Sequence, residues 1–300
     1  MSKIIAEPGI YLNISADDYF ADPAPEPSLT QSIAKTILAQ SAEHAQWDHP
    51  RLGNGREPEE EYKQAREIGN VAHKILLGRG KDVTIIEADS FRGGDAKKQK
   101  DAALAVGSVP ILAKHYGRAE AMARKARIVM DGLGLGDVGG DSEVVMVWTD
   151  GGIWCRTMVD RLSKDRCVVL DYKTTAGSWA PHDSSFGRKI IDAGWDIQAA
   201  MHQRALNELH PESAGRREHI FLAQENYPPY AVVPIELPEV WLSMGDRKLT
   251  AAMDVWKRCL NTGIWESYPD HLVVPEYPDF AMSKWLSREE NEFVDLRMAG

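Results

Sequence analysis

Two aspartates and a lysine in the segment MVDRLSKDRCVVLDYKTT, residues 158–175, have the types and spacing for chemistry at a metal ion. Asp160 ends one apolar run, and Asp171 follows a second apolar run, CVVL. Carboxylates brought together at strand ends form a site for a hard cation, and Mg²⁺ is usually held by one or two carboxylates plus substrate phosphates. Lys173 lies two residues after Asp171, so a strand would direct both side chains to the same face.

A predicted hairpin directly upstream supplies a third acid. Glu143 begins the apolar run EVVMVW, and the turn sequence TDGG follows it. Asp-Gly between two such runs is a strong signal for a β-hairpin. We therefore expect three consecutive strands, at about 142–149, 153–161 and 166–174. Convergence at one edge of that sheet would bring together Glu143, Asp160, Asp171 and Lys173. The alternative is that the acids cap separate strand ends and point apart.

Two amphipathic helices flank these strands in the sequence. The first, EYKQAREIGNVAHKILLG, has apolar residues at helical spacing and carries His73 four residues after Gly69. Residues four apart share a helix face, so the glycine leaves room beside the imidazole for a ligand or a close backbone approach. The second helix, DAGWDIQAAMHQRAL, carries Gln198. Each polar residue also has an ordinary explanation, because a lone histidine is often a packed core or surface residue and a lone glutamine usually faces solvent.

The rest of the chain predicts an α/β (α+β) fold in which helices flank a mixed sheet. Further helices are expected from Ser28 to about Ala45, at 110–131 and at 238–261, and further strands in HIFLAQE and YAVVPIEL. We expect an N-terminal arm, helix and loop over residues 1–60, a catalytic domain over 61–285 and a charged tail over 286–300. The loop at 47–60 could lie over the mouth of the site.

The order of these motifs resembles the exodeoxyribonuclease VIII (RecE-like) family, in the lambda-exonuclease/RecB-type branch of the PD-(D/E)xK nuclease superfamily. The ordered elements are G-N-x-A-H, a glutamate, an aspartate, D-Y-K-T-T and D-I-Q-A-A-M-H-Q. The resemblance runs from about residue 9, in GIYLNISADDYF, to residue 285. Two residues depart from it, because His202 stands where relatives often carry tyrosine and Trp195 where another aromatic residue is common. The matching residues are His73, Glu143, Asp160, Asp171, Lys173 and Gln198.

The resemblance implies a restriction-endonuclease-like core that holds Mg²⁺, with Mn²⁺ as a substitute. Asp160 and Asp171 would be the carboxylate ligands. The backbone carbonyl of Tyr172 and the imidazole of His73 would add further ligands, and Glu143 would bind a second ion or orient a water. Two ions about 3.5–4 Å apart can stabilise the attacking and the leaving oxygen in phosphodiester hydrolysis.

The resemblance also implies roles in the reaction itself. Lys173 would position or help deprotonate the attacking water and offset negative charge in the transition state. Gln198 would hold Lys173 or the scissile phosphate by hydrogen bonds. Thr174 and Thr175 could donate to a phosphate, or they could simply cap the strand. A degenerate copy of such a nuclease is expected to have lost at least one of the matching residues, and all of them are present.

The implied activity is that of a Mg²⁺-dependent exonuclease on linear duplex DNA. It would digest one strand from the 5′ end and leave 3′ single-stranded tails for recombination. Bacterial or phage-encoded enzymes of this kind act beside a single-strand annealing protein (RecT-like) and form rings around DNA. One alternative of the same fold is an endonuclease, or a nuclease specific for single strands or flaps. An alternative of another class is a catalytically silent DNA-binding or recombinase-docking module.

Overall charge at first disfavours nucleic-acid binding, because the chain has a formal net charge of −10. Basic residues are nonetheless clustered in FRGGDAKKQKD, which combines a Gly-Gly pair with high charge and shows no apolar face. We expect this flexible segment to contact DNA through Arg92, Lys97, Lys98 and Lys100. The alternative is that such clusters are solvated helix faces.

Several classes of protein are disfavoured by what the sequence lacks. No run approaches the roughly 18 apolar residues that a transmembrane helix needs, and the N-terminus resembles no secretory signal, so we expect a cytoplasmic location. The three cysteines show no C-x-x-C spacing, which disfavours a zinc site or an iron–sulfur cluster. No G-x-x-x-x-G-K-[ST] loop is present, so the sequence does not indicate an ATP-driven motor.

Overall fold

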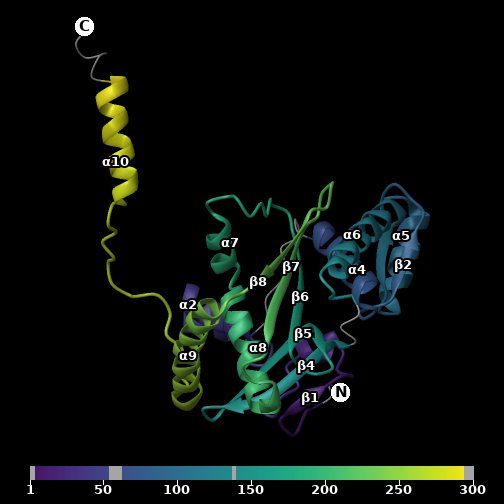
Figure 1. The fold of residues 1–300 in the computed structure, drawn as a ribbon, viewed down its shortest axis with the longest axis horizontal. Coiled ribbons are helices and arrows are strands. Elements are labelled where there is room, and N and C mark those ends of the chain that lie inside the picture. Colours follow the sequence, from purple (N-terminus) through teal and green to yellow (C-terminus); the bar gives the residue numbers. More distant parts are fainter. Residues whose placement is uncertain (1–3, 54–62, 137–139, 294–300) are drawn as a thin grey trace. The chain divides into compact units, whose positions relative to one another are not determined.

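A mixed six-stranded sheet, in the order β1-β4-β5-β6-β7-β8, forms the centre of the larger of two compact units, Met1–Glu266 and Ser267–Gly300 (Figure 1). The computed structural model describes residues 4–53, 63–136 and 140–293. Among the described strands of this sheet, only β6 and β7 are parallel neighbours. The strands are β1 (Gly9–Tyr11), β4 (Gly140–Asp150), β5 (Ile153–Ser163), β6 (Val168–Thr175), β7 (Glu218–Glu225) and β8 (Val232–Glu236).

Helices cover both faces of this sheet, which confirms the expected α/β class. A second sheet consists of the parallel strands β2 (Val83–Ile86) and β3 (Val109–Leu112). The helices of the first unit are α1 (Ala16–Phe20), α2 (Gln31–Ala39), α3 (Ala42–Asp48), α4 (Lys63–Leu77), α5 (Gly94–Ala105), α6 (Ala113–Gly132), α7 (Phe186–Ala193), α8 (Trp195–Leu209), the 3₁₀ turn η2 (Pro211–Ser213) and α9 (Glu239–Thr262). The three strands that carry Glu143, Asp160 and Asp171 lie close to their predicted positions. So do the helices predicted at 61–77, 110–131 and 238–261, as far as the structure describes them. The helix predicted at 191–209 is instead divided at Gly194, where α7 ends and α8 begins.

Alternation along β6 decides which helices face its side chains. Val169 belongs to a core cluster shared with α2, α8 and α9, whereas Leu170 and Tyr172 belong to a cluster shared with α4 and α6. Figure 1 shows α8 and α9 on one side of the sheet and α4 and α6 on the other. Successive strand residues point to opposite faces, so Asp171 and Lys173 point to the side of α8.

A buried ion cluster fixes the N-terminal segment to β5. Arg156 forms an ion pair with Asp22 Oδ1 at 2.9 Å and donates to the Ser28 carbonyl at 2.8 Å. His49 Nε2 lies 3.2 Å from Asp22 Oδ2, and neither of these two side chains has exposed area. Burial alone raises the pKa of Asp22, but hydrogen bonds from His49 and Ser28 and the charge of Arg156 hold the pKa below its usual range.

Replacing Asp22 by asparagine is expected to destabilise the fold by about 3–5 kcal/mol, because it leaves the Arg156 guanidinium buried without a carboxylate. The lowered pKa of Asp22 means that its contribution is complete above the pKa of an unfolded aspartate, about 3.9, and is lost as pH falls through the folded value. The variant should therefore lose less stability than the wild type on acidification. Urea unfolding followed by circular dichroism at pH 7, 4 and 3 measures both effects, and equal stability at pH 7 would contradict the prediction.

The N-terminal helix is interrupted, contrary to expectation. The single helix predicted from Ser28 to about Ala45 is two helices, α2 and α3. Gln40 leaves the helical region with φ −129° and ψ −94°, and the Ser41 hydroxyl then caps the start of α3. Thr30 caps α2, because the Ser28 hydroxyl instead donates to Asp22. Buried residues of the N-terminal region, α2 and α3 belong to two core clusters. Of the loop predicted at 47–60, residues 47–53 are described and the first two belong to α3, whereas residues 54–60 lie outside the described residues.

The basic segment at 92–100 is also more regular than expected, because most of it forms α5. Ala96 and Ala103 are buried on this helix, so the apolar face consists of alanines that the charge pattern conceals. α5 packs against β2 and β3. Arg92, Lys97 and Lys98 are exposed, which keeps them available for an anionic partner.

The second unit contains α10 (Asp279–Arg288) and the π-helical turn η3 (Glu289–Phe293). The sequence places the start of a C-terminal tail at residue 286, whereas the boundary between the compact units lies between Glu266 and Ser267. The physical reason is that residues 267–293 contribute no buried side chain. Within the ranges that the structure describes, no helix is long and apolar enough to cross a membrane.

Candidate active site

The side chain of Asp160 reaches β6 where β5 and β6 separate. The described ladder between these strands consists of the pairs Arg161↔Leu170 and Leu162↔Val169. Beyond it the backbone N–H of Tyr172 donates to Asp160 Oδ2 at 2.7 Å. The N–H of Tyr172 thus donates to the side chain of Asp160 and not to a backbone carbonyl of β5. This places Asp160 beside the strand that carries Asp171 and Lys173.

Asp171 is the most buried acid of the site, with 2% of its side-chain surface exposed. Its Oδ1 accepts from Lys173 Nζ at 3.1 Å and from Gln198 Nε2 on α8 at 2.9 Å. Burial lowers the pKa of Lys173, but the carboxylates of Asp171 and Asp160 outweigh burial, and the net shift is upward. The site therefore holds a protonated lysine between two carboxylates.

His73 joins the site from α4, on the other side of the sheet. Its Nε2 lies 3.1 Å from Asp160 Oδ1. Burial lowers the pKa of His73, but the hydrogen bond and charge of Asp160 reverse that effect, so the pKa is raised. The pKa of Asp160 is raised by burial and lowered more strongly by His73 and Lys173. The two side chains form an ion pair when His73 is protonated.

Gly69 explains how α4 comes close enough to place His73. A Cβ at this position would overlap the Thr174 hydroxyl of β6. The sequence left open whether the glycine makes room for a ligand or for a backbone, and in the structure the side chain of Thr174 occupies this space. Gly69 and His73 lie one turn apart on the same face, so the distance between Gly69 and Thr174 also sets how close the imidazole of His73 comes to Asp160.

Replacing Gly69 by alanine is expected to push α4 away from β6 and to lengthen the His73–Asp160 contact. Overpacking of this kind typically costs about 1–3 kcal/mol. Thermal unfolding measures the cost, and the double variant Gly69→Ala/Thr174→Ala should recover part of it because the clashing hydroxyl is gone. An unchanged melting temperature in the single variant would contradict the overlap.

Glu143 lies next to this pair in an unusual backbone conformation. It stands opposite Asp160 in the β4–β5 register, yet the described pairing skips from Ser142↔Arg161 to Val144↔Val159. Its φ of 52° lies in the left-handed region, which costs a non-glycine residue about 1–3 kcal/mol and is common at functional sites. Burial, with the nearby Asp160, raises the pKa of Glu143 despite the opposing charge of His73.

The side chains of the site are of the types that bind a hard divalent cation. In the part of the chain that the structure describes, however, no three Asp, Glu, His or Cys side chains lie close enough together to form a complete metal site. Asp160 is paired with His73, and Asp171 is paired with Lys173. Carboxylate oxygens are the ligands that Mg²⁺ prefers, and Asp160 and Asp171 supply them from adjacent strands. The site residues thus fit the cation chemically, with their negative charge balanced internally.

The remaining predicted site residues have local contacts. The Tyr172 hydroxyl points away from the acids and donates to Gln224. The Thr175 hydroxyl donates to the Gly177 carbonyl at 2.9 Å, as a strand cap would. Among the predicted DNA contacts, Lys100 lies over the Phe91 ring at 5.0 Å.

The structure adds one residue to which sequence reasoning gave no role. His202, fully buried on α8, places Nδ1 3.5 Å from Asp171 Oδ2. Burial, together with the charge of Lys173, lowers the pKa of His202 although Asp171 raises it. The available signal was its position four residues after Gln198, which puts both side chains on one helix face.

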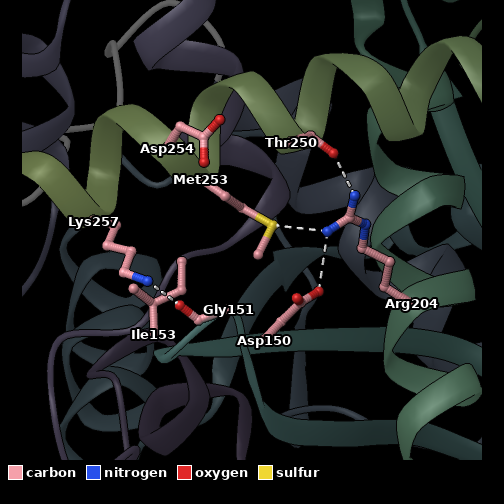
Figure 2. Close-up of a pocket in the computed structure, with 8 residues that line it drawn as sticks. All are labelled: Asp150, Gly151, Ile153, Arg204, Thr250, Met253, Asp254 and Lys257. Atoms are coloured by element: carbon pink, nitrogen blue, oxygen red, sulfur yellow. Dashed lines mark hydrogen bonds and ion pairs between the residues drawn. The ribbon is translucent and has the colours of Figure 1, made fainter.

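A pocket of about 220 Å³ lies elsewhere, between the β4–β5 turn and α9. Ile153 lines it, and β5 carries the chain seven residues from there to Asp160, or about 23 Å along the strand. Figure 2 shows Arg204 turned toward Asp150, Met253 and Thr250, and Lys257 toward the Gly151 carbonyl. The two basic side chains of this pocket, Arg204 and Lys257, therefore form contacts that join α8, α9 and the β4–β5 hairpin.

Comparison with known proteins identifies the family and the fold of the chain. The model of the PDDEXK-like domain of unknown function (DUF3799) matches residues 37–272. The crystal structure of a "putative exonuclease" from Eubacterium rectale has a TM-score of 0.59 and 15% identity, over 91% of this chain and 98% of that chain. An alkaline exonuclease (LHK-Exo) from Laribacter hongkongensis has a TM-score of 0.24 and 13% identity, over 69% and 100%. No curated protein sequence matches. The chain belongs to the PDDEXK-like family DUF3799.

Proposed function

We propose that this protein is a Mg²⁺-dependent nuclease that hydrolyses phosphodiester bonds of linear double-stranded DNA as an exonuclease. The observation that carries the proposal is the separation of β5 and β6, which places Asp160 beside Asp171 and Lys173. A PDDEXK-like family match and fold likeness to a "putative exonuclease" support it. Two carboxylates on adjacent strands can hold a metal ion, and a lysine beside them can assist the attack of a water on a phosphate diester.

One group of residues would bind the metal ions. Asp160 and Asp171 would hold the ions, with His73, Glu143 and the Tyr172 carbonyl as further ligands. Bound Mg²⁺ would supply Lewis-acid stabilisation of the phosphate oxygens.

Lys173 and Gln198 would act on the substrate side of the site. Because the pKa of Lys173 is raised, its ammonium suits donation to the water or to the phosphate oxygens better than proton abstraction. Gln198 donates to the carboxylate of Asp171, which also accepts from Lys173.

The finer assignment is a RecE-like exodeoxyribonuclease that works in the bacterial cytoplasm, encoded by the cell or by a phage. We propose 5′→3′ polarity, 3′ tails for recombination, an annealing partner (RecT-like) and a ring-shaped homo-oligomer. DNA would contact the exposed basic residues around α5, together with Thr174 and Thr175. These proposals rest on the sequence resemblance.

End-labelled DNA tests the proposal directly. Linear duplex DNA labelled separately at each 5′ and 3′ end, and covalently closed circular DNA, are incubated with the protein in the presence of Mg²⁺, Mn²⁺ or EDTA. Mg²⁺-dependent release of the 5′ label, with 3′ ends retained and the circle intact, is expected. Nicking of the circle would replace the proposal by an endonuclease. Absence of cleavage with Mg²⁺ and Mn²⁺ would leave a DNA-binding module.

A further inference from the structure

The oxygens of Asp171 are restrained unequally. Oδ1 accepts hydrogen bonds from both Lys173 and Gln198, whereas no hydrogen bond holds Oδ2 among the residues that the structure describes. Rotation about the Cβ–Cγ bond moves both oxygens, and in the described part of the chain only the hydrogen bonds to Oδ1 oppose it. A contact at Oδ2 would add a second restraint on the orientation of Asp171.

His202 is the group that faces this oxygen. Its Nδ1 lies 3.5 Å from Oδ2, just beyond ordinary hydrogen-bond length. Within the described ranges, both ring nitrogens lack a hydrogen-bond partner, and the side chain has no exposed area. Leaving a buried polar group unsatisfied costs about 1–3 kcal/mol, so a short movement that closes this contact is favourable.

The neighbouring ring of His219 offers His202 no alternative hydrogen bond through its Nε2 proton. The ring of His219 on β7 stacks against it with centroids 6.4 Å apart and planes inclined by 18°. His219 Nε2 donates to the side-chain amide oxygen Oε1 of Gln203 at 3.0 Å, so the proton on Nε2 is used there. The nitrogen of His202 that faces a carboxylate carries a proton in the neutral Nδ1–H form and in the imidazolium alike.

We propose that His202 is a positioning residue, whose Nδ1–H holds Oδ2 of Asp171 and so fixes the orientation of this metal-binding carboxylate. The inference rests on the proposed function for its effect on catalysis, but the contact itself does not. Gln198 and His202, one turn apart on α8, would then hold the two oxygens of one carboxylate. Groups that orient a metal ligand typically affect affinity or activity about 10–100-fold.

Two substitutions separate the two ring nitrogens. In His202→Asn the amide nitrogen lies near the position of Nδ1, whereas in His202→Gln it lies near the position of Nε2. We expect His202→Gln to lower both Mn²⁺ affinity, measured by calorimetry with Mn²⁺ alone, and the rate of DNA cleavage by about 10–100-fold. His202→Asn should recover most of both losses. Equal values for His202→Gln and wild type would overturn the proposal.

A control variant separates positioning from general stability. Leu206 is fully buried one turn after His202 and packs into the core cluster away from Asp171. Leu206→Ala should lower stability by about 2–5 kcal/mol while Mn²⁺ affinity and cleavage stay near wild type. If Leu206→Ala lowers both as much as His202→Gln does, the effect is structural and the proposal fails.

A tautomer measurement tests the contact without activity. Long-range ¹H–¹⁵N correlation spectra of the wild type should show a proton on Nδ1 of His202, and Asp171→Asn should shift that signal. A proton on Nε2 alone would overturn the inference. Should the wild type cleave no DNA, the proposed function fails, and the spectra and Mn²⁺ affinities still decide the role of His202.

Discussion

Replacing Lys173 by alanine is expected to lower DNA cleavage about 1,000-fold and to leave the affinity for Mn²⁺ within a few-fold of wild type. The ammonium lies against Asp171, and its raised pKa keeps it charged where negative charge would develop on the phosphate. Removing one preorganised donor to such a charge costs about 10²–10³-fold, and lost proton transfer or water positioning adds to this. The carboxylates that bind the cation remain.

Measurement of both quantities makes this prediction specific. Single-turnover cleavage gives the rate, and calorimetry with Mn²⁺ alone gives the affinity. Lys173→Arg is the matched control, because it keeps the positive charge and should retain more activity than alanine. Near-normal cleavage by Lys173→Ala would show that the assigned chemistry is wrong, even if metal still binds.

Strands β4, β5 and β6 were predictable because their sequence signals are local. An Asp-Gly turn between two apolar runs fixed the β4–β5 hairpin, and alternation along β6 put Asp171 and Lys173 on one face. The pairing of Asp160 with His73 joins residues far apart in the sequence. The family resemblance implied only that His73 and Asp160 would bind the same metal site, because periodicity within a helix does not say which strand the helix covers.

Other features lay beyond sequence reasoning for identifiable reasons. The parallel pair β2–β3 consists of strands of four residues, too short for a clear alternation, and α5 between them hides its apolar face in alanines. The left-handed φ of Glu143 depends on the interrupted ladder with β5. The contact of His202 with Asp171 depends on the packing of α8 over β6, which no local pattern encodes.

Replacing Asp160 by asparagine is expected to impair both metal binding and cleavage, in contrast to the lysine variant. The amide keeps an oxygen for the Tyr172 N–H but removes the negative charge that balances His73 and would bind the cation. Metal stabilisation of the transition state is worth several kcal/mol, and 1.4 kcal/mol is a factor of ten, so the rate should fall about 10²–10⁴-fold. Mn²⁺ affinity should fall together with the rate.

The same substitution should be visible in the titration of His73. Burial lowers the pKa of His73, and Asp160 is the main group that raises it above the ordinary value. Without that charge the pKa should fall, which NMR of the imidazole measures in metal-free protein. In the wild type, the raised pKa makes the pair stabilising below the unfolded value of about 6.5, and this contribution is lost as pH rises through the folded value. An unchanged His73 titration in Asp160→Asn would show that the imidazole is held by other groups, and His73 would then be a packing residue of α4.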